Sequence, residues 1–284
     1  MHRSILFLLN LEVCARALLL TLSLGAVSAT AQTVIVNETF TDGNRGMQKS
    51  PHSLNWHCTE GHTRVGVADG WLTISSGVKS ANSVVANFPY VELKEGQSLR
   101  LALQFRPEVK IVDSTLYMMM VGLFDSNGEP PIAKDKSDPA PLRSRGYAVP
   151  LNYNGTPPEG YDSGYFLRVL KRNKDEGPLI TSSRGYSLLA NRQNEPVPVV
   201  LESGLTYDLE LIFTRESSQT LRIEGKISGV GLREDIHIIT KDTHEICHGF
   251  DTIALTSFFN NSGAEATGGF TSVSYSSIRL EPYL

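Results

Sequence analysis

Long apolar runs and excess positive charge are both scarce in this sequence. After residue 31, no stretch approaches the eighteen consecutive apolar residues that a membrane-spanning helix needs. The formal net charge is −4, without runs of like charge. A mildly acidic protein has no electrostatic attraction to nucleic acid or anionic lipid. We therefore expect a soluble mature protein that neither inserts into membranes nor binds nucleic acid.

A helical pattern is also lacking, since no window of twelve residues has an apolar stripe at helical spacing. Short alternating segments occur instead, at Leu99–Phe105, Leu205–Phe213 and Thr220–Ile227. Two further segments, Leu116–Phe124 and Ile253–Phe259, are apolar on both faces and are typical of central strands. Many short strands in one domain indicate an antiparallel sandwich or a closed barrel, and we predict an all-β, two-sheet antiparallel jelly-roll sandwich.

The N-terminus has the features of an export signal. The apolar stretch Leu18–Val27 is too short to anchor the chain in a bilayer. It leads into Ala29–Ala31, a small-x-small site that predicts cleavage before Gln32, and Val27–Ala29 is a second acceptable site. We predict a signal peptide at residues 1–31, rather than a membrane anchor, and one domain at 32–284. The mature protein is expected to be secreted or periplasmic.

Cysteine is rare, with three in the whole chain, and Cys14 would leave with the signal peptide. Cys58 and Cys247 remain, and an even pair in an oxidising compartment predicts a disulfide. Closing so long a loop is worth about 4–5 kcal/mol in the chain-entropy model. Zinc held by the two thiolates and two of the nearby histidines, His57, His62, His244 and His248, is the alternative. Because neighbours on a strand point to opposite faces, we favour the disulfide.

Several segments carry a resemblance to a known family: Asn37–Arg45, Ser53–Trp56, Gly164–Val169, Gly185–Leu189, Phe250–Leu255 and Phe270–Leu280. The pattern resembles that of bacterial secreted concanavalin A-like (laminin-G-like) sandwich domains, in which a phenylalanine-aspartate-glycine stretch begins the first strand. This resemblance implies a two-sheet sandwich. Its members include lectin-like binding modules, glycoside hydrolases and polysaccharide lyases, so the fold leaves the function open.

The same resemblance implies a structural calcium ion, because some of these domains hold one near the first strand. Glu38 and Asp42 would supply hard carboxylate oxygens for it. The aspartate of the last strand is missing here, where the chain reads Tyr275–Ile278. Solvated surface acids are the alternative for Glu38 and Asp42. No other cofactor is expected.

Residues 125–164 are rich in proline and tyrosine, and long irregular connections in compact domains are often functional. Tyrosine rings stack on the apolar faces of sugars, while amides, guanidinium groups and carboxylates bind sugar hydroxyls. The predicted ligand-binding residues are Tyr147, Asn152, Tyr153, Tyr161, Asp162, Tyr165 and Arg168. The alternative is that some of these tyrosines belong to the core.

Catalytic signatures are weak. A retaining glycosidase needs two carboxyl groups about 5–5.5 Å apart, and no acid-x-acid-x-acid stretch occurs. Asp208 and Glu210 share a strand face, which is the polar face. A lyase needs a base and a cation, but Tyr165 and Arg168 are at odd spacing and face opposite sides of a strand.

We therefore predict a non-catalytic, extracellular carbohydrate-binding (lectin-like) protein with a polysaccharide or glycan as its partner. The first alternative is a polysaccharide-degrading enzyme, a lyase rather than a hydrolase, with bases drawn from His52, His57 and His62. The second is a structural protein of the cell envelope. In that case the sheet face that binds ligands elsewhere would be filled by the protein's own side chains.

Overall fold

A computed structural model describes residues 33–46, 52–59, 64–76, 80–109, 115–130, 132–135, 143–152, 166–172, 179–180, 185–191, 201–261 and 271–283. The chain divides into two units, Met1–Gln32 and Thr33–Leu284. The first unit, and with it the predicted signal peptide, lies outside the described residues, so the fold below is that of the second.

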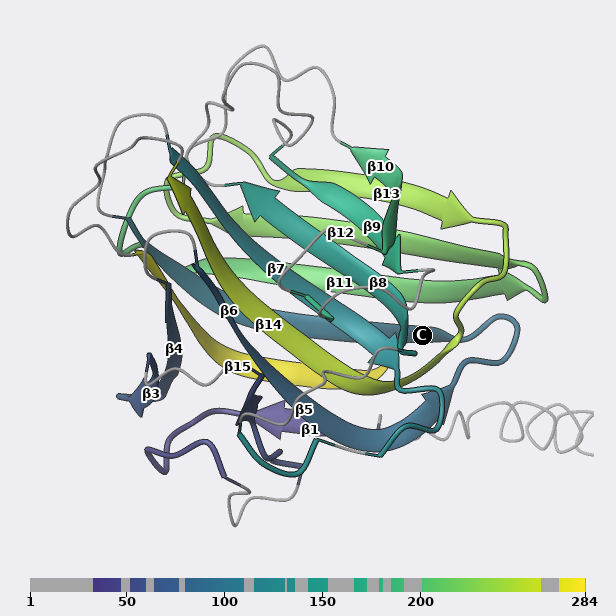
Figure 1. Ribbon diagram of the computed structural model, residues 1–284. Coiled ribbons are helices and arrows are strands. Elements are labelled where there is room, and N and C mark those ends of the chain that lie inside the picture. Colours follow the sequence, from purple (N-terminus) through teal and green to yellow (C-terminus); the bar gives the residue numbers. More distant parts are fainter. Residues whose placement is uncertain are drawn as a thin grey trace, which may run out of the picture. The chain divides into compact units, whose positions relative to one another are not determined.

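Two sheets make up this unit, and every described strand pairing is antiparallel (Figure 1). The eight-stranded sheet has the order β13-β12-β11-β6-β15-β4-β3, with β1 also paired to β15. Its strands are β1 (Val36–Glu38), β3 (Val65–Ala68), β4 (Trp71–Ser76), β6 (Ser98–Val109), β11 (Tyr207–Ser217), β12 (Thr220–Gly229), β13 (Ile236–Asp242) and β15 (Thr271–Tyr283).

The seven-stranded sheet has the order β10-β9-β8-β7-β14-β5-β2. Its strands are β2 (His57–Cys58), β5 (Ser80–Glu92), β7 (Thr115–Asp125), β8 (Arg145–Asn152), β9 (Arg168–Arg172), β10 (Tyr186–Asn191) and β14 (Gly249–Asn261). No helix occurs in the described part of the chain, and none there is long and apolar enough to cross a membrane.

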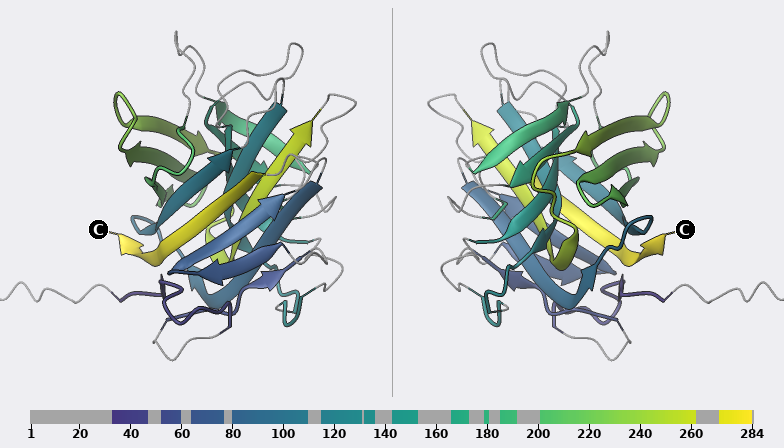
Figure 2. Two further views of the ribbon diagram at one scale, coloured as in Figure 1. Left: turned by 90° about the vertical axis from the view of Figure 1, so that its left-hand side faces the viewer. Right: turned by 90° about the vertical axis from the view of Figure 1, so that its right-hand side faces the viewer.

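The connectivity is that of a jelly roll. Consecutive strands β5, β6 and β7 alternate between the sheets, and so do β14 and β15, which lie in different layers (Figure 2). β14 inserts between β5 and β7 in one sheet, and β15 inserts between β4 and β6 in the other. The chain is thus rolled as a long antiparallel ribbon, which confirms the predicted two-sheet jelly-roll sandwich expected from the concanavalin A-like resemblance.

Alternation along the strands builds the core between the sheets. Leu99, Leu101, Leu103 and Phe105 of β6 are buried there, as the pattern predicted. On β7, Val121 and Leu123 face this core, whereas Met120 and Phe124 belong to a second apolar cluster on the opposite face of the sheet. β7 and β14 are central strands, so the prediction from their two-sided apolarity is confirmed.

Candidate functional site

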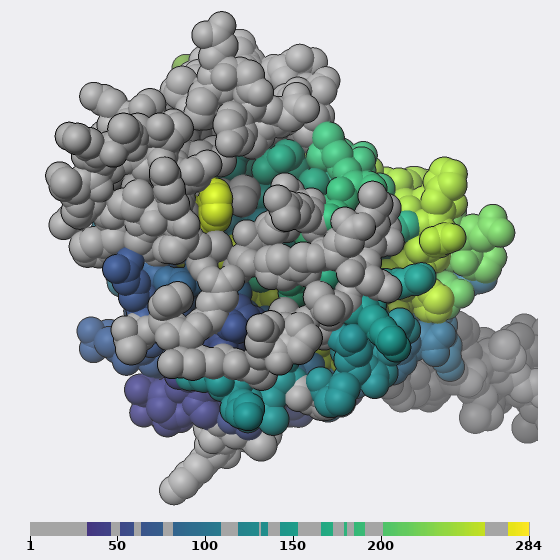
Figure 3. Space-filling view, in the orientation of Figure 1, coloured from purple at the N-terminus to yellow at the C-terminus, as the bar shows by residue number. Residues whose placement is uncertain are grey.

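The outer face of the seven-stranded sheet points away from the eight-stranded sheet and is turned toward the viewer in Figures 1 and 3. A transverse row of small or apolar residues runs across its strands in register: Val85, Ala254, Gly122, Ala148 and Leu170. Val85, Ala148 and Ala254 are fully buried. A floor of small side chains of this kind lets other groups approach the sheet closely.

The chain's own residues cover the middle of this outer face. The second apolar cluster joins Phe124 and Leu170 on the sheet to Ile132, Leu179 and Ile180, which come from connecting segments. Leu179 and Ile180 are each 1% exposed. This part of the outer face is therefore packed as a small second core.

Polar contacts hold the covering segment in place. Arg172 is buried, its Nε donates to the Ser144 carbonyl at 3.1 Å, and its guanidinium lies 5.5 Å from the Tyr186 ring centroid. The Tyr186 hydroxyl donates to the Leu179 carbonyl. Burial raises the pKa of Tyr186, so the hydroxyl stays protonated and remains a donor.

Asn152 and Arg168 lie toward the other end of the same face. Val149 and Leu151 of β8 face the main core, so alternation along the strand places Asn152 on the outer face. Leu170 of β9 belongs to the outer cluster, so Arg168, two residues earlier, also lies on the outer face. Burial lowers the pKa of the Arg168 guanidinium without removing its charge. The Asn152 N–H donates to the Phe166 carbonyl at 2.9 Å. The connection between them therefore leaves and re-enters the sheet at neighbouring points.

Four of the predicted ligand-binding residues belong to that connection: Tyr153, Tyr161, Asp162 and Tyr165. They lie outside the described residues, so their part in a site stays a prediction. Of the predicted set, the structure brings Asn152 and Arg168 to one face.

Tyr147 takes a different place from the one we expected. Its odd spacing from Asn152 on β8 turns it into the core, where it is 0% exposed. Its hydroxyl donates to Asp242 Oδ2 at 2.7 Å and accepts from the Cys247 N–H at 3.0 Å. This placement corrects our grouping of Tyr147 with Asn152 and Arg168, and the core alternative applies to it.

Tyr147 belongs to a buried polar network between the sheets that sequence analysis missed. Lys171 of β9 lies 2.8 Å from Asp242 Oδ2 at the end of β13, and it also donates to the His244 carbonyl. The Asp242 Oδ1 accepts the His244 N–H at 3.1 Å. The sequence contained a signal for this network. Lys171 follows Leu167 and Val169 at alternate positions of β9, so its side chain points into the core as theirs do.

A second missed cluster lies at the β2 edge. Arg45 donates to both oxygens of Asp135, at 3.1 and 2.7 Å, and the Cys58 N–H donates to the same carboxylate at 2.9 Å. The His57 imidazole is 3.8 Å from it. Hydrogen bonding to Arg45 lowers the pKa of Asp135, while burial lowers that of His57 and favours the neutral ring. Arg45 is matched by Asp135, so its charge is already balanced.

Among the strands that the structure describes, none brings a carboxylate to the Asn152–Arg168 end. The strands of the seven-stranded sheet contain three acidic residues, Glu92, Asp125 and Asp251, and all three lie at or near the opposite strand ends. The described strands therefore offer no carboxylate pair for glycoside hydrolysis at the Asn152–Arg168 end. Asp208 and Glu210 lie in the other sheet, where Glu210 pairs with Arg100 at 2.6 Å.

The predicted disulfide is not formed, since Cys58 and Cys247 are both free, buried thiols. Cys58 pairs with Val84 on β5, whereas Gly249, two residues after Cys247, pairs with Glu92. Eight residues of strand, roughly 25 Å, separate the two positions along β5. A disulfide needs Cα atoms within about 7 Å, so these cysteines cannot meet.

The residues proposed for calcium have other contacts. Glu38 is fully buried, and its two carboxylate oxygens accept the N–H groups of Phe40, Leu54 and the Trp56 indole at 3.1–3.3 Å. Asp42 accepts from the backbone and side chain of Asn44. No group of three or more His, Cys, Asp or Glu that could hold a metal occurs among the described residues. The calcium site stays a prediction without support from these contacts.

The protein is thus an antiparallel jelly-roll sandwich. The outer face of its seven-stranded sheet is partly covered by side chains of the same chain. No family model and no curated protein matches the chain. A mutant of the alginate lyase Aly36B in complex with alginate trisaccharide is 12% identical, with 89% of this chain and 100% of that chain covered and a TM-score of 0.45. The carbohydrate recognition domain of Emp47p is 14% identical, with 92% and 100% covered and a TM-score of 0.47. The basic winged bean lectin with Tn-antigen is 10% identical, with 84% and 96% covered and a TM-score of 0.48. Likenesses this distant assign neither a ligand nor a reaction to this chain.

Proposed function

We propose that this protein is a non-catalytic, lectin-like sandwich that binds carbohydrate after export from the cytoplasm. The observation that carries the proposal is the Asn152–Arg168 end of the outer face. It presents an amide and a guanidinium on one side of the sheet, at the two points where the tyrosine-rich connection begins and ends. The described strands place no carboxylate beside them.

The chemistry of this end suits a sugar. The amide of Asn152 both donates and accepts, and the guanidinium of Arg168 donates in a planar fork. A guanidinium withdrawn from water binds a carboxylate or a hydroxyl pair more strongly than an exposed one does. Acidic glycans are therefore the preferred ligands in this proposal.

A lyase is the second candidate, and His57 favours it. Its pairing with Val85 places the imidazole on the same outer face, and its lowered pKa keeps it neutral near neutral pH, as a general base requires. Against it, the nearby guanidinium of Arg45 already donates two hydrogen bonds to Asp135, so its charge is not available to a uronate carboxylate.

The test is a binding screen of the purified protein against neutral and uronate polysaccharides, with the ultraviolet absorbance of an unsaturated lyase product followed in parallel. We expect binding without an absorbance rise. Arg168→Ala should weaken binding to an acidic glycan about tenfold or more, as loss of a hydrogen bond to a charged group does. Arg222→Ala, on the other sheet and 38% exposed, is the matched control.

Three results would change the proposal. A rising absorbance that is lost in His57→Ala would establish the lyase. Equal binding by wild type and Arg168→Ala would remove the Asn152–Arg168 end as the site. No binding to any polysaccharide would leave the envelope-protein alternative, which the filled middle of the outer face already fits.

A further inference from the structure

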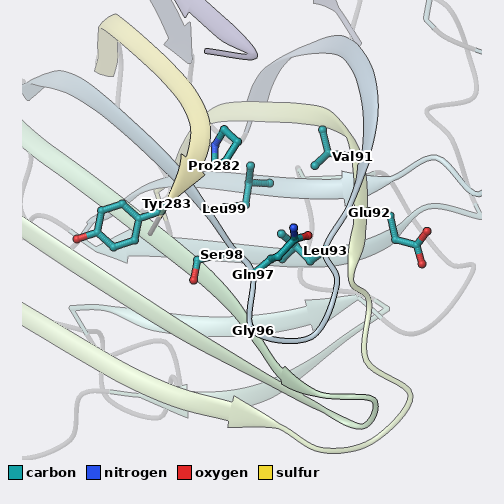
Figure 4. A pocket seen from close by; sticks show the side chains of 9 residues that line it. All are labelled: Val91, Glu92, Leu93, Gly96, Gln97, Ser98, Leu99, Pro282 and Tyr283. Carbon is teal, nitrogen blue, oxygen red and sulfur yellow. The ribbon is translucent and has the colours of Figure 1, made fainter. Parts of the chain in front are cut away.

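The far face of the sandwich is the side of the eight-stranded sheet that points away from the seven-stranded sheet, and it presents a charged group held ready for a ligand. The hollow of about 330 Å³ at the connection from β5 to β6 does not (Figure 4). Its floor is apolar, with Leu93 and Leu99 2% and 0% exposed. Figure 4 shows the Tyr283 ring and the Glu92 carboxylate on opposite sides of the hollow, each pointing away from it. These two groups therefore do not converge on a common ligand.

On the far face, Arg106 of β6 reaches across a neighbouring strand to the ring of Trp71 on β4. The sheet order is β6-β15-β4, so β15 lies between the two residues. The guanidinium carbon of Arg106 is nevertheless 4.7 Å from the centroid of the Trp71 ring. Both side chains belong to the far face, because Phe105 and Leu72, their neighbours along the two strands, are buried in the main core. Arg106 therefore lies over β15 and stacks on the indole.

Small side chains on β15 make room for this crossing. The residues of β15 that face outward here are Ser272, Ser274 and Ser276, which are 7%, 3% and 9% exposed. Ser274 is the register partner of Arg106 on one side and of Thr73 on the other. The hydroxyls of Ser274 and Thr73 are 2.8 Å apart and satisfy each other. The serines thus allow Arg106 to reach Trp71, and the group open to a ligand is the guanidinium above them.

Stacking, rather than an acid, holds the Arg106 guanidinium. Among the described residues its one ion pair is with Glu108, whose Oε1 lies 4.0 Å from Nε, too far for a hydrogen bond. This Nε is buried and has no hydrogen-bond partner in the described part of the chain. By contrast, Arg100, on the same face of the same strand, donates to Glu210 and Glu281 at 2.6 and 2.9 Å. The charge of Arg100 is therefore balanced by hydrogen-bonded acids, and that of Arg106 is not.

The stack leaves the edge of the guanidinium open to a ligand. A planar guanidinium that rests on an aromatic ring uses its face, while its N–H groups point outward in its plane. The Arg106 side chain is 36% exposed, so part of this edge reaches solvent. Two parallel N–H groups match the paired oxygens of a carboxylate or a sulfate, and the stack reduces the cost of ordering the long side chain. The arrangement therefore suits an oxyanion.

We propose that Arg106 and Trp71 form a second glycan-binding site, which recognises a carboxylate or sulfate group of an acidic glycan. The inference rests on the proposed carbohydrate binding and places a further site on the opposite side of the sandwich from the Asn152–Arg168 end. Because the two faces point away from each other, one protein molecule would hold two glycan chains. Glu108 limits the affinity of the second site, since its carboxylate repels an anion beside Arg106.

The experiment adds trigalacturonate, a sulfated galactose oligosaccharide or neutral galactotriose to the full protein and follows tryptophan fluorescence and calorimetry. The chain has two tryptophans, and Trp56 is a core residue that is 2% exposed, so a change in emission on binding reports Trp71. At least one of the acidic oligosaccharides should change the emission, and the neutral one should not. Which acidic oligosaccharide acts distinguishes a carboxylate from a sulfate. Trp71→Phe should remove the emission change.

Variants then locate the binding. Arg106→Ala should weaken binding at this site about tenfold or more, as loss of a hydrogen bond to a charged group does. Glu108→Gln should strengthen it about threefold. Calorimetry should count two sites in wild type and one in either Arg106→Ala or Arg168→Ala. Arg222→Ala is the matched control, because Arg222 lies on the same far face, is 38% exposed and is paired with an acid at 2.9 Å.

An emission change that keeps its wild-type affinity in Arg106→Ala overturns the inference, and so does an equal response to galactotriose. Acidic glycan that binds at a single site, lost in Arg168→Ala and without a change in emission, removes the second site while the proposed function stands. If no carbohydrate binds at all, both fail together.

Discussion

Replacing Lys171 with methionine tests how much the buried network between the sheets depends on its charge balance. The side chains of Lys171 and Asp242 are 9% and 2% exposed, and their atoms are 2.8 Å apart. Methionine keeps the length and apolar stem of lysine but leaves the Asp242 carboxylate buried without its cation. Removing one partner of a buried ion pair costs about 3–5 kcal/mol.

The remaining contacts favour the lower part of that range. In Lys171→Met, Asp242 still accepts the Tyr147 hydroxyl and the His244 N–H, so its desolvation is partly compensated. We expect a loss of about 3 kcal/mol in the free energy of unfolding. The double variant Lys171→Met with Asp242→Asn removes both charges and keeps an oxygen for Tyr147. It should regain most of the loss, because an uncharged buried set needs no counter-ion.

Urea unfolding followed by tryptophan fluorescence measures both variants, with the slope against denaturant compared to confirm a common unfolding transition. Lys171→Met within about 0.5 kcal/mol of wild type would refute the argument, since a surface substitution has an effect of that size. A double variant as unstable as the single one would refute it equally. It would show that lost packing, rather than the uncompensated carboxylate, causes the change.

Three further predictions concern the core. Trp56→Ala should destabilise by about 3–5 kcal/mol in thermal or urea unfolding, because the ring is 2% exposed and its indole N–H binds Glu38; unchanged stability would place the ring outside the core. Gly146→Ala should lower stability by at least about 2 kcal/mol, since φ is 146° and a Cβ would lie 2.3 Å from a backbone oxygen; a wild-type melting temperature would contradict the geometry. Burial raises the pKa of Cys247 to about 12 from an ordinary 9.0. The folded state therefore holds the thiol proton more tightly than the unfolded state does. The contribution of Cys247 to the free energy of unfolding is complete below its ordinary pKa and is lost as the pH rises toward about 12. Unfolding free energies at about pH 8 and pH 10 should fall more in wild type than in Cys247→Ala, and equal slopes would contradict the burial of this thiol.

Sequence pattern was sufficient to predict β6, β7, β11, β12 and β14, because the information is local. β6, β11 and β12 alternate with period two, and each buries the face that the pattern marks as apolar. β7 and β14 lack alternation because they are covered on both faces, which their composition also indicated. Composition alone grouped Tyr147 with Asn152 in one ligand site. The two residues are an odd number of positions apart on β8, so their side chains lie on opposite faces of the sheet.

The polar clusters could not be predicted, because they depend on register between distant strands. Arg45 and Asp135 are 90 residues apart, and Tyr147 and Asp242 are 95 apart. Each side chain alone is an ordinary charge or hydroxyl, and only the sheet order brings them together. The disulfide prediction failed for the same reason. An oxidising compartment and an even number of cysteines do not reveal that Cys58 and Cys247 lie beside distant positions along β5.

Register also restricts where a ligand can lie on the outer face. Ile132, Leu179 and Ile180 occupy its middle. A ligand in the middle of this face would have to displace the buried apolar cluster, whereas a ligand at the Asn152–Arg168 end would not. Displacement would expose side chains that are each worth about 1.5–3 kcal/mol when buried, so the Asn152–Arg168 end is favoured.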